Sequence, residues 1–336
     1  MSVIERDEVA SLILERRARR SRPGARDDGF RLALAIEGGG MRGVVAGGMV
    51  SALEAHGFVD CFDAVYGTSA GACAGAYMLA GQAREGTRIF YEDINNPSFL
   101  RLGRVLLRRP VMNVDHLIDH VMTRSRPLDV EAVVRSTIPL VMMTTSVGEG
   151  RALALRDFAN GPAVLEGLRA TTRLPLVAGL PVVDTDGRKL VDGALTAPIP
   201  VRAAAEDGAT HILVLATRHD VTTIDGGPVR PWFARMLARH VSPAVAGAYL
   251  ARQAVFEELS AQLAGPRLGF GAEPHLAVVK PTGRWRKVSK IEKRAGRLLR
   301  GADAGWRAVL HWLGEADATP FPDMIAYRGK RRRRES

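Results

Sequence analysis

The chain has 336 residues, of which 46% are hydrophobic and 25% charged, with a formal net charge of +11. This composition is globular and excludes collagen-like, low-complexity and disordered chains. Two cysteines, Cys61 and Cys73, cannot form a disulfide framework, and no Cys/His cluster predicts a metal site. No apolar run approaches the roughly 20 residues of a transmembrane helix, and residues 1–26 lack the apolar core of a signal peptide. We therefore expect a cytoplasmic protein.

The basic excess is gathered near the C-terminus. Residues 284–300 hold eight basic side chains against Glu292, and residues 328–336 hold six against Glu335. Without these two segments the chain has a net charge of −1. Their charge favours peripheral contact with an anionic membrane, with a solvated tail as the alternative. The lack of a recognised binding motif argues against a nucleic-acid partner.

The first part of the chain alternates strand-like and helix-like segments. A charged arm at 1–27, with a short amphipathic helix near 9–17, precedes an apolar run at 31–37 that predicts a buried strand. Residues 44–56 have helical spacing and end at a glycine, as helices commonly do. A second short strand at 64–66 and a helix that ends at Leu79 complete the pattern of an α/β protein with right-handed crossovers.

Further strands and helices are expected downstream. Residues 138–145 and 211–217 resemble buried strands, and Asp186-Gly187 predicts the turn of a hairpin ending at residue 192. The pattern is mostly helical at 232–263 and indicates a basic amphipathic helix at 285–313. The prediction is a three-layer α/β protein: a catalytic domain at 28–283 follows the arm, and a basic helical extension at 284–336 follows the domain.

A glycine loop follows the first strand and permits three interpretations. It consists of Gly38, Gly39, Gly40, Met41, Arg42 and Gly43. Its G-x-G-x-x-G spacing matches the dinucleotide-binding fingerprint, but Asp60 and Asp63 precede the second strand instead of following it. A purely structural turn is the second interpretation. In the third, backbone N–H groups at a helix N-terminus stabilise a developing oxyanion.

A nucleophile for that third interpretation follows the second strand. Gly67-Thr68-Ser69-Ala70-Gly71 has the G-x-S-x-G pattern that places a serine on a sharp strand-to-helix turn. The pattern is weak alone, and an ordinary turn is the alternative. Its place one element after the glycine loop strengthens the prediction.

Two kinds of base could serve this serine. Of the eight histidines, His211 and His219 follow Asp192 in the Ser…Asp…His order of a hydrolase triad. Asp192 itself, in the Asp192-Gly193-Ala194 sequence, ends the returning strand of the hairpin and is not needed for its turn. An Asp-Gly pair is nevertheless more often a turn than a catalytic group.

Together, GGGMRG at 38–43, GTSAG at 67–71 and DGA at 192–194 resemble the bacterial patatin-like phospholipases, a family of serine acyl hydrolases with a Ser/Asp dyad. The resemblance extends over about residues 31–217. It implies a patatin-like fold with a mainly parallel sheet and a nucleophile elbow. Ser69 would attack the ester and Asp192 would act as general base.

The resemblance also implies that Gly39 and Gly40 donate to the oxyanion, that Arg42 adds positive potential or braces the loop, and that no cofactor or metal is needed. The substrate would be a lipid or other acyl ester, cleaved by phospholipase A, lysophospholipase or esterase activity. A nucleotide-binding α/β protein and a catalytically inactive membrane-binding protein are the alternatives. The sequence does not predict the oligomeric state.

Overall fold

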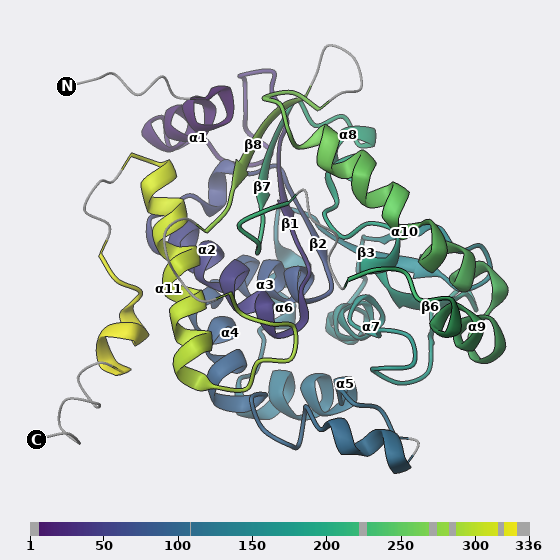
Figure 1. The fold of residues 1–336 in the computed structure, drawn as a ribbon. Helices are drawn as coiled ribbons and strands as arrows, with labels where there is room; N and C mark the ends of the chain where they lie inside the picture. Colours follow the sequence, from purple (N-terminus) through teal and green to yellow (C-terminus); the bar gives the residue numbers. More distant parts are fainter. Residues whose placement is uncertain are drawn as a thin grey trace, which may run out of the picture.

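Helices cover both faces of a central β-sheet in the computed structural model, which describes residues 7–107, 109–221, 227–268, 274–281, 287–314 and 319–327 (Figure 1). Within these ranges the sheet has eight strands, in the order β5-β6-β3-β2-β1-β7-β8, and β4 pairs with β3 beside this path. The strands are β1 (Leu32–Ile36), β2 (Ala64–Thr68), β3 (Leu140–Ser146), β4 (Ala152–Leu155), β5 (Val182–Val183), β6 (Lys189–Asp192), β7 (His211–Leu215) and β8 (His275–Val279).

The five strands β3, β2, β1, β7 and β8 are parallel, whereas β4, β5 and β6 run antiparallel to their neighbours. The predicted three-layer α/β fold with a mainly parallel sheet is therefore confirmed. The predicted hairpin also forms, as β5 and β6.

The helices are α1 (Glu8–Ala18), α2 (Val44–Ala55), α3 (Ala70–Leu79), α4 (Ala83–Arg88), α5 (Val114–His116), α6 (Val130–Arg135), α7 (Gly161–Thr171), α8 (Val201–Glu206), α9 (Pro231–His240), α10 (Pro243–Gln262) and α11 (Ala295–Trp312). Short 3₁₀ turns are η1 (Gly40–Gly43), η2 (Val59–Cys61), η4 (Leu102–Leu107) and η6 (Gly193–Leu195), and π-helical turns are η3 (Ile89–Asp93) and η5 (Leu117–Ser125). No helix in the described ranges is long and apolar enough to cross a membrane.

Alternating side chains of the central strands enter two separate cores, because successive residues of a strand point to opposite faces. Leu34 and Ile36 of β1 join the core beneath α2, α3 and α11. Ala33 and Ala35 enter the core beneath α8 and the end of α10. Since both faces are covered, β1 is apolar at every position.

Two strands share one edge of β3, and this arrangement positions the site. Leu140–Met143 pair with β2, and 144–146 pair with β6. Residues 142–145 also pair with β4, which must therefore lie along the opposite edge. β6 thus pairs with the same edge of β3 as β2, starting at the residue after the pairing with β2 ends. Asp192, opposite Thr144, consequently meets the end of β2 at Thr68, opposite Met143.

Both terminal helices pack into the main core. Val9, Leu12 and Ile13 of α1 are buried there, and α11 packs along α2. At the crossing of α2 and α11, a Cβ on Gly48 would lie 2.0 Å from the carbonyl oxygen of Ala302. The domain boundaries at residues 27 and 283 rest on charge and motif content alone, and they remain a prediction.

The sequence prediction was wrong about where the C-terminal helix begins. Helix α11 starts at Ala295, whereas helix was expected from residue 285; residues 282–286 lie outside the described ranges. Residues 287–294 are not helical because this segment crosses the glycine loop. There the Met41 N–H donates to the Lys290 carbonyl at 3.1 Å. The Glu292 carboxylate then accepts the Lys293 and Arg294 N–H groups just before the helix.

Candidate active site

Ser69 lies on a sharp turn between β2 and α3. Its φ of 54° and ψ of −126° are rare for a residue with a side chain, and such strain costs about 1–3 kcal/mol. Local hydrogen bonds hold this conformation: the Ser69 N–H donates to Thr171 Oγ1 at 2.9 Å, and the Ser69 carbonyl accepts the Ala72 N–H. A Cβ on Gly71 would lie 2.4 Å from the Ile36 carbonyl oxygen, so the turn requires glycine there.

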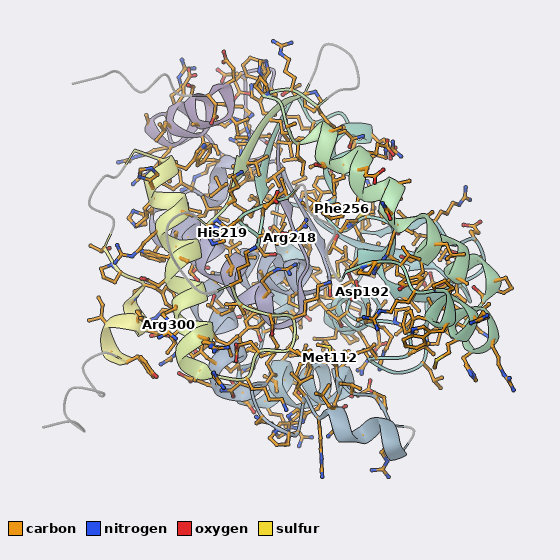
Figure 2. The ribbon with its side chains drawn as sticks, viewed as in Figure 1. Met112, Asp192, Arg218, His219, Phe256 and Arg300 are labelled. Carbon is orange, nitrogen blue, oxygen red and sulfur yellow. The ribbon has the colours of Figure 1, made fainter. Side chains whose placement is uncertain are left out.

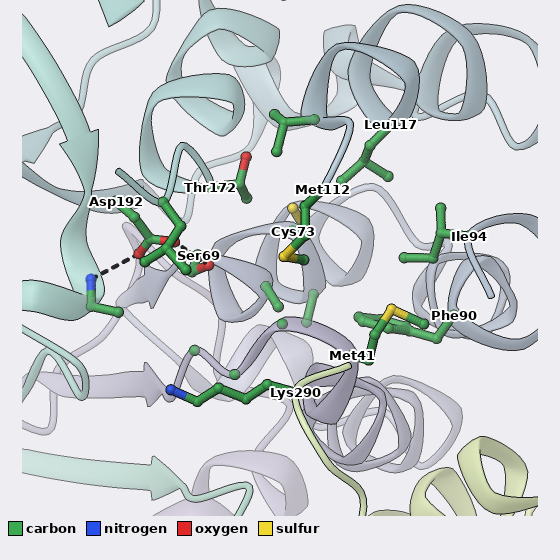
Figure 3. A pocket seen from close by; sticks show the side chains of 18 of the residues that line it. Met41, Ser69, Cys73, Phe90, Ile94, Met112, Leu117, Thr172, Asp192 and Lys290 are labelled. Carbon is green, nitrogen blue, oxygen red and sulfur yellow. Dashed lines mark hydrogen bonds between the residues drawn. The ribbon is translucent and has the colours of Figure 1, made fainter. Parts of the chain in front are cut away.

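Asp192 and Ser69 form a direct hydrogen bond, as the strand pairing requires. Ser69 Oγ donates to Asp192 Oδ2 at 2.8 Å, and Asp192 Oδ1 accepts the Ala194 N–H at 2.8 Å (Figure 3). The Asp192 backbone is fixed as well, because its N–H donates to the Arg173 carbonyl and its carbonyl accepts Thr145 Oγ1. The carboxylate is therefore held in place independently of a substrate.

Burial changes the basicity of Asp192. Only 3% of the residue is exposed, and desolvation raises the pKa of its carboxyl group from 3.8 to about 6. The hydrogen bonds from Ala194 and Ser69, and the positive charge of Lys290, oppose part of this increase. A carboxylate with this pKa is a stronger base than an ordinary aspartate and is still ionised at neutral pH.

The glycine loop lies beside Ser69. A Cβ on Gly38 would lie 3.1 Å from the Ser69 Cβ. Gly38 donates its N–H to the Pro198 carbonyl, and Met41 donates to Lys290. Within the part of the chain that the structure describes, the Gly39 and Gly40 N–H groups have no such acceptor. They are accordingly the loop's two candidate oxyanion donors.

Gly40 also has a conformational role in the loop. Its φ is +56°, and a Cβ there would lie 2.9 Å from the Lys290 carbonyl oxygen. A side chain at this position would be strained and would push the 287–294 segment away. At the end of the loop, Gly43 packs against Ala70, so the loop and the turn of Ser69 fit together closely.

Arg42 holds the glycine loop in place through a buried polar network with Thr217 and Glu37. Its Nε donates to Thr217 Oγ1 at 2.9 Å, and a guanidinium nitrogen lies 3.8 Å from Glu37 Oε1. Glu37 is 1% exposed and accepts hydrogen bonds from the Thr217 N–H and from Arg218 Nε. Of the two roles expected for Arg42, bracing is the one that these contacts support.

The remaining motif residues surround the dyad. Gly67 and Thr68 end β2, and Thr68 Oγ1 donates to the Ala197 carbonyl at 2.7 Å. Ala70 begins α3, and Gly193 and Ala194 form the start of η6. The structure thus brings all three sequence blocks together at one end of the parallel strands.

Thr171 and Lys290 are site residues to which the sequence reasoning gave no role. The Thr171 hydroxyl donates to the Met143 carbonyl at 2.5 Å while it accepts the Ser69 N–H, so it links β3 to the turn. In Figure 3, the Lys290 side chain extends along the glycine loop, with Nζ on the side of Ser69 and Asp192. Neither residue belongs to a short motif, so no local signal identified it.

An apolar cavity of about 300 Å³ extends from the dyad. Ser69, Asp192, Lys290 and Arg252 are among its polar lining residues. Its apolar walls come from α3, from η3, from η5 and from the stretch between η3 and η5, and include Ala74, Tyr77, Phe90, Ile94, Phe99, Met112, Leu117 and Met122. A hydrogen-bonded serine and aspartate beside an apolar cavity would suit an ester with a hydrocarbon chain.

The histidines of the alternative triad lie elsewhere. His211 begins β7, whereas Ser69 follows the last residue of β2, so His211 lies at the opposite end of the parallel strands, where it stacks on His275. His219 is not among the residues that line the cavity, and Figure 2 shows it well separated from Asp192, beyond Arg218. Of these three candidate bases, Asp192 is the one whose side chain accepts a hydrogen bond from Ser69 Oγ.

Cys73 and the pair His116 and His120 are further side chains of types that can act as nucleophiles or metal ligands. Cys73 lines the cavity one turn after Ser69, but desolvation raises the pKa of its thiol to about 12, so it stays protonated. His116 and His120 stack at 5.1 Å between ring centroids. No group of three or more metal-ligating side chains occurs among the described residues.

The family model described as "Patatin-like phospholipase" matches residues 34–205, about half of the chain. An uncharacterized NTE family protein of Mycobacterium tuberculosis (strain ATCC 25618 / H37Rv) is 27% identical over 201 residues, which is 60% of this chain and 51% of that protein. An uncharacterized NTE family protein of Mycobacterium bovis matches equally well. The chain thus spans about half the length of the curated relatives it matches.

Solved structures resemble the chain more distantly. VipD from Legionella pneumophila has a TM-score of 0.42 and 11% identity, with 84% of this chain and 66% of that chain covered. Human GIVD cytosolic phospholipase A2, in complex with methyl gamma-linolenyl fluorophosphonate, has a TM-score of 0.43 and 14% identity. That comparison covers 91% of this chain and 62% of the human one.

Proposed function

The chain belongs to the patatin-like phospholipase family, and from this premise we propose that it is a serine lipid acyl hydrolase, with Ser69 as nucleophile and Asp192 as general base. One observation carries the proposal: the 2.8 Å hydrogen bond from Ser69 Oγ to Asp192 Oδ2, beside two available N–H donors and an apolar cavity. Nucleophile, base, oxyanion donors and acyl site are the parts that acyl transfer needs.

In the first half of the reaction, Ser69 Oγ attacks the ester carbonyl carbon and its proton moves to Asp192. The carbonyl electrons move to oxygen, and the Gly39 and Gly40 N–H groups stabilise the resulting negative charge. The tetrahedral intermediate then collapses, the bond to the alcohol breaks, and the alcohol takes the proton from Asp192. An acyl-enzyme on Ser69 remains.

In the second half, Asp192 accepts a proton from water, and the resulting nucleophile attacks the acyl-enzyme. Collapse releases the fatty acid and returns the proton to Ser69. The dyad needs no third residue to fix the base, because the Asp192 backbone and Oδ1 are already anchored. Phospholipase A, lysophospholipase and simple esterase activities all fit this chemistry.

Hydrolysis of p-nitrophenyl esters and of phospholipid vesicles tests the proposal. Ser69→Ala and Asp192→Asn should each lower kcat by at least about 10³-fold, because each removes a group that acts in the transition state. Asp186→Asn is the matched control, since Asp186 lies exposed in the turn of the same hairpin. This variant should retain wild-type activity. Wild-type turnover in either dyad variant would contradict the assignment.

A further inference from the structure

One face of α9 exposes apolar and basic side chains together. Trp232, Arg235, Met236 and Arg239 follow the i, i+3, i+4, i+7 spacing of a single helix face, and we call these four residues the α9 surface. Trp232 is 50% exposed and Met236 41% exposed, and both arginines are exposed. Large exposed apolar side chains that cluster are characteristic of an interaction site.

The opposite face of α9 already accounts for the attachment of the helix. Ala234 and Leu237 are buried in a small core with Val147, Val191 and Val245. The hydrophobic side chains of the α9 surface are therefore not required to hold the helix on the protein. We infer that they contact a binding partner.

The charges around the surface indicate the chemistry of that partner. Residues 227–256 contain four arginines and no acidic residue. Among the described residues, Arg230, Arg235 and Arg239 form no ion pair, so their charge is available to an anion. A tryptophan and a methionine flanked by arginines match the anionic headgroups and upper acyl region of a bilayer.

Helix α9 and the segment before it also contact residues that line the cavity. Arg252, which lines the cavity, donates to the Gly227 carbonyl, and the Arg230 N–H donates to Tyr249 Oη at 3.1 Å. The segment that leads into α9 is therefore fastened to α10 next to the cavity. Leu195 also lines the cavity and packs in the same small core as Phe233 of α9.

We propose that the α9 surface docks on an anionic phospholipid bilayer and thereby holds the neighbouring cavity at the lipid surface. Docking itself does not require catalysis; only the delivery of substrate depends on the proposed lipid hydrolase function. The α9 surface belongs to a different part of the sequence from the basic segments at 284–300 and 328–336, from which membrane contact was predicted.

Co-sedimentation of the full chain with vesicles tests the proposal, using phosphatidylcholine with about 30% phosphatidylglycerol and phosphatidylcholine alone. The wild type should bind the anionic vesicles and release them at high salt. Trp232→Ser with Met236→Ser, and separately Arg235→Gln with Arg239→Gln, should each weaken binding at least about 10-fold. Arg22→Gln with Arg124→Gln is the charge-matched control and Ile325→Ser the apolar control, because all three residues are exposed elsewhere.

Two readouts separate this proposal from the proposed function. Ser69→Ala should bind vesicles as the wild type does, and the α9 variants should hydrolyse a short soluble p-nitrophenyl ester at wild-type rates. The proposal is overturned if the wild type does not bind anionic vesicles, or if Gln at positions 330–334 abolishes binding while the α9 variants retain it. It is also overturned if the α9 variants change only the oligomeric state, which would make the surface an interface with a second copy.

Discussion

Burial of the Asp192 carboxylate has two opposite consequences, one for its basicity and one for the stability of the fold. Desolvation raises the pKa of its carboxyl group to about 6, which improves it as a base. The same burial makes the ionised carboxylate unfavourable in the folded protein relative to the unfolded chain. The residue that we assign to catalysis should therefore lower the stability of the fold at neutral pH.

Asp192→Asn should stabilise the fold at pH 7.5. The folded protein binds its proton more tightly than the unfolded chain, so the wild type loses stability as pH rises from about 4 to 6 and stays at that lower level above. A pKa difference of about two units corresponds to at most about 3 kcal/mol. Urea unfolding should show the variant more stable at pH 7.5, with a much smaller difference near pH 4. A variant less stable than the wild type at pH 7.5 would contradict this reasoning.

At the residue scale, the sequence identified Ser69, Asp192 and the glycine loop, which the fold brings together, because short motifs encode tight local geometry. GTSAG requires small residues where Gly71 touches the end of β1, and such requirements are visible in one chain. Thr171 contacts Ser69, which is 102 residues away in sequence, and Lys290 contacts Met41, which is about 250 residues away. No local pattern reports such contacts, so only the fold identifies them.

At the scale of elements, one shared edge of β3 brings the dyad together. β2 and β6 occupy successive parts of this edge, so the end of each strand determines where its functional residue lies. The hairpin was predictable from Asp186-Gly187, but its pairing with β3 was not. The start of α11 was mispredicted for a related reason, because the long-range contact between Lys290 and Met41 overrides the helical pattern.

The α2–α11 crossing should be sensitive to a single methyl group. Gly48→Ala places a Cβ within 2.0 Å of the Ala302 carbonyl oxygen, so the helices must separate and the 287–294 segment must shift from the glycine loop. Overpacking of this kind costs about 1–3 kcal/mol. Unfolding and kcat should show that stability and turnover fall together.

Gly247→Ala is the matched control for that substitution. Gly247 also lies inside a helix, but a Cβ there meets no atom within 4 Å. This variant should gain up to about 1 kcal/mol from improved helix propensity and keep its activity. Equal effects of the two substitutions would contradict the role given to the crossing.

At the scale of the whole molecule, the family region at 34–205 contains the dyad and the glycine loop, but other segments complete the site. Lys290, Arg252 and Phe256 line the cavity from outside that region, and Thr217 holds Arg42. From the sequence, the basic excess near the C-terminus was expected to contact a membrane, and the catalytic motifs were expected in residues 28–283. The structure links the two, because the basic 287–294 segment crosses the glycine loop.

The pH dependence of fluorophosphonate labelling tests the central claim most directly, because it reports activation of the nucleophile without a known substrate. Peptide mapping should place the adduct on Ser69, with a labelling rate that rises with an apparent pKa of about 6 as Asp192 ionises. Asp192→Asn should lose both the fast rate and this pH dependence, whereas Asp186→Asn should keep both. Labelling at another residue, or an Asp192→Asn variant labelled at the wild-type rate, would contradict the Ser69–Asp192 dyad.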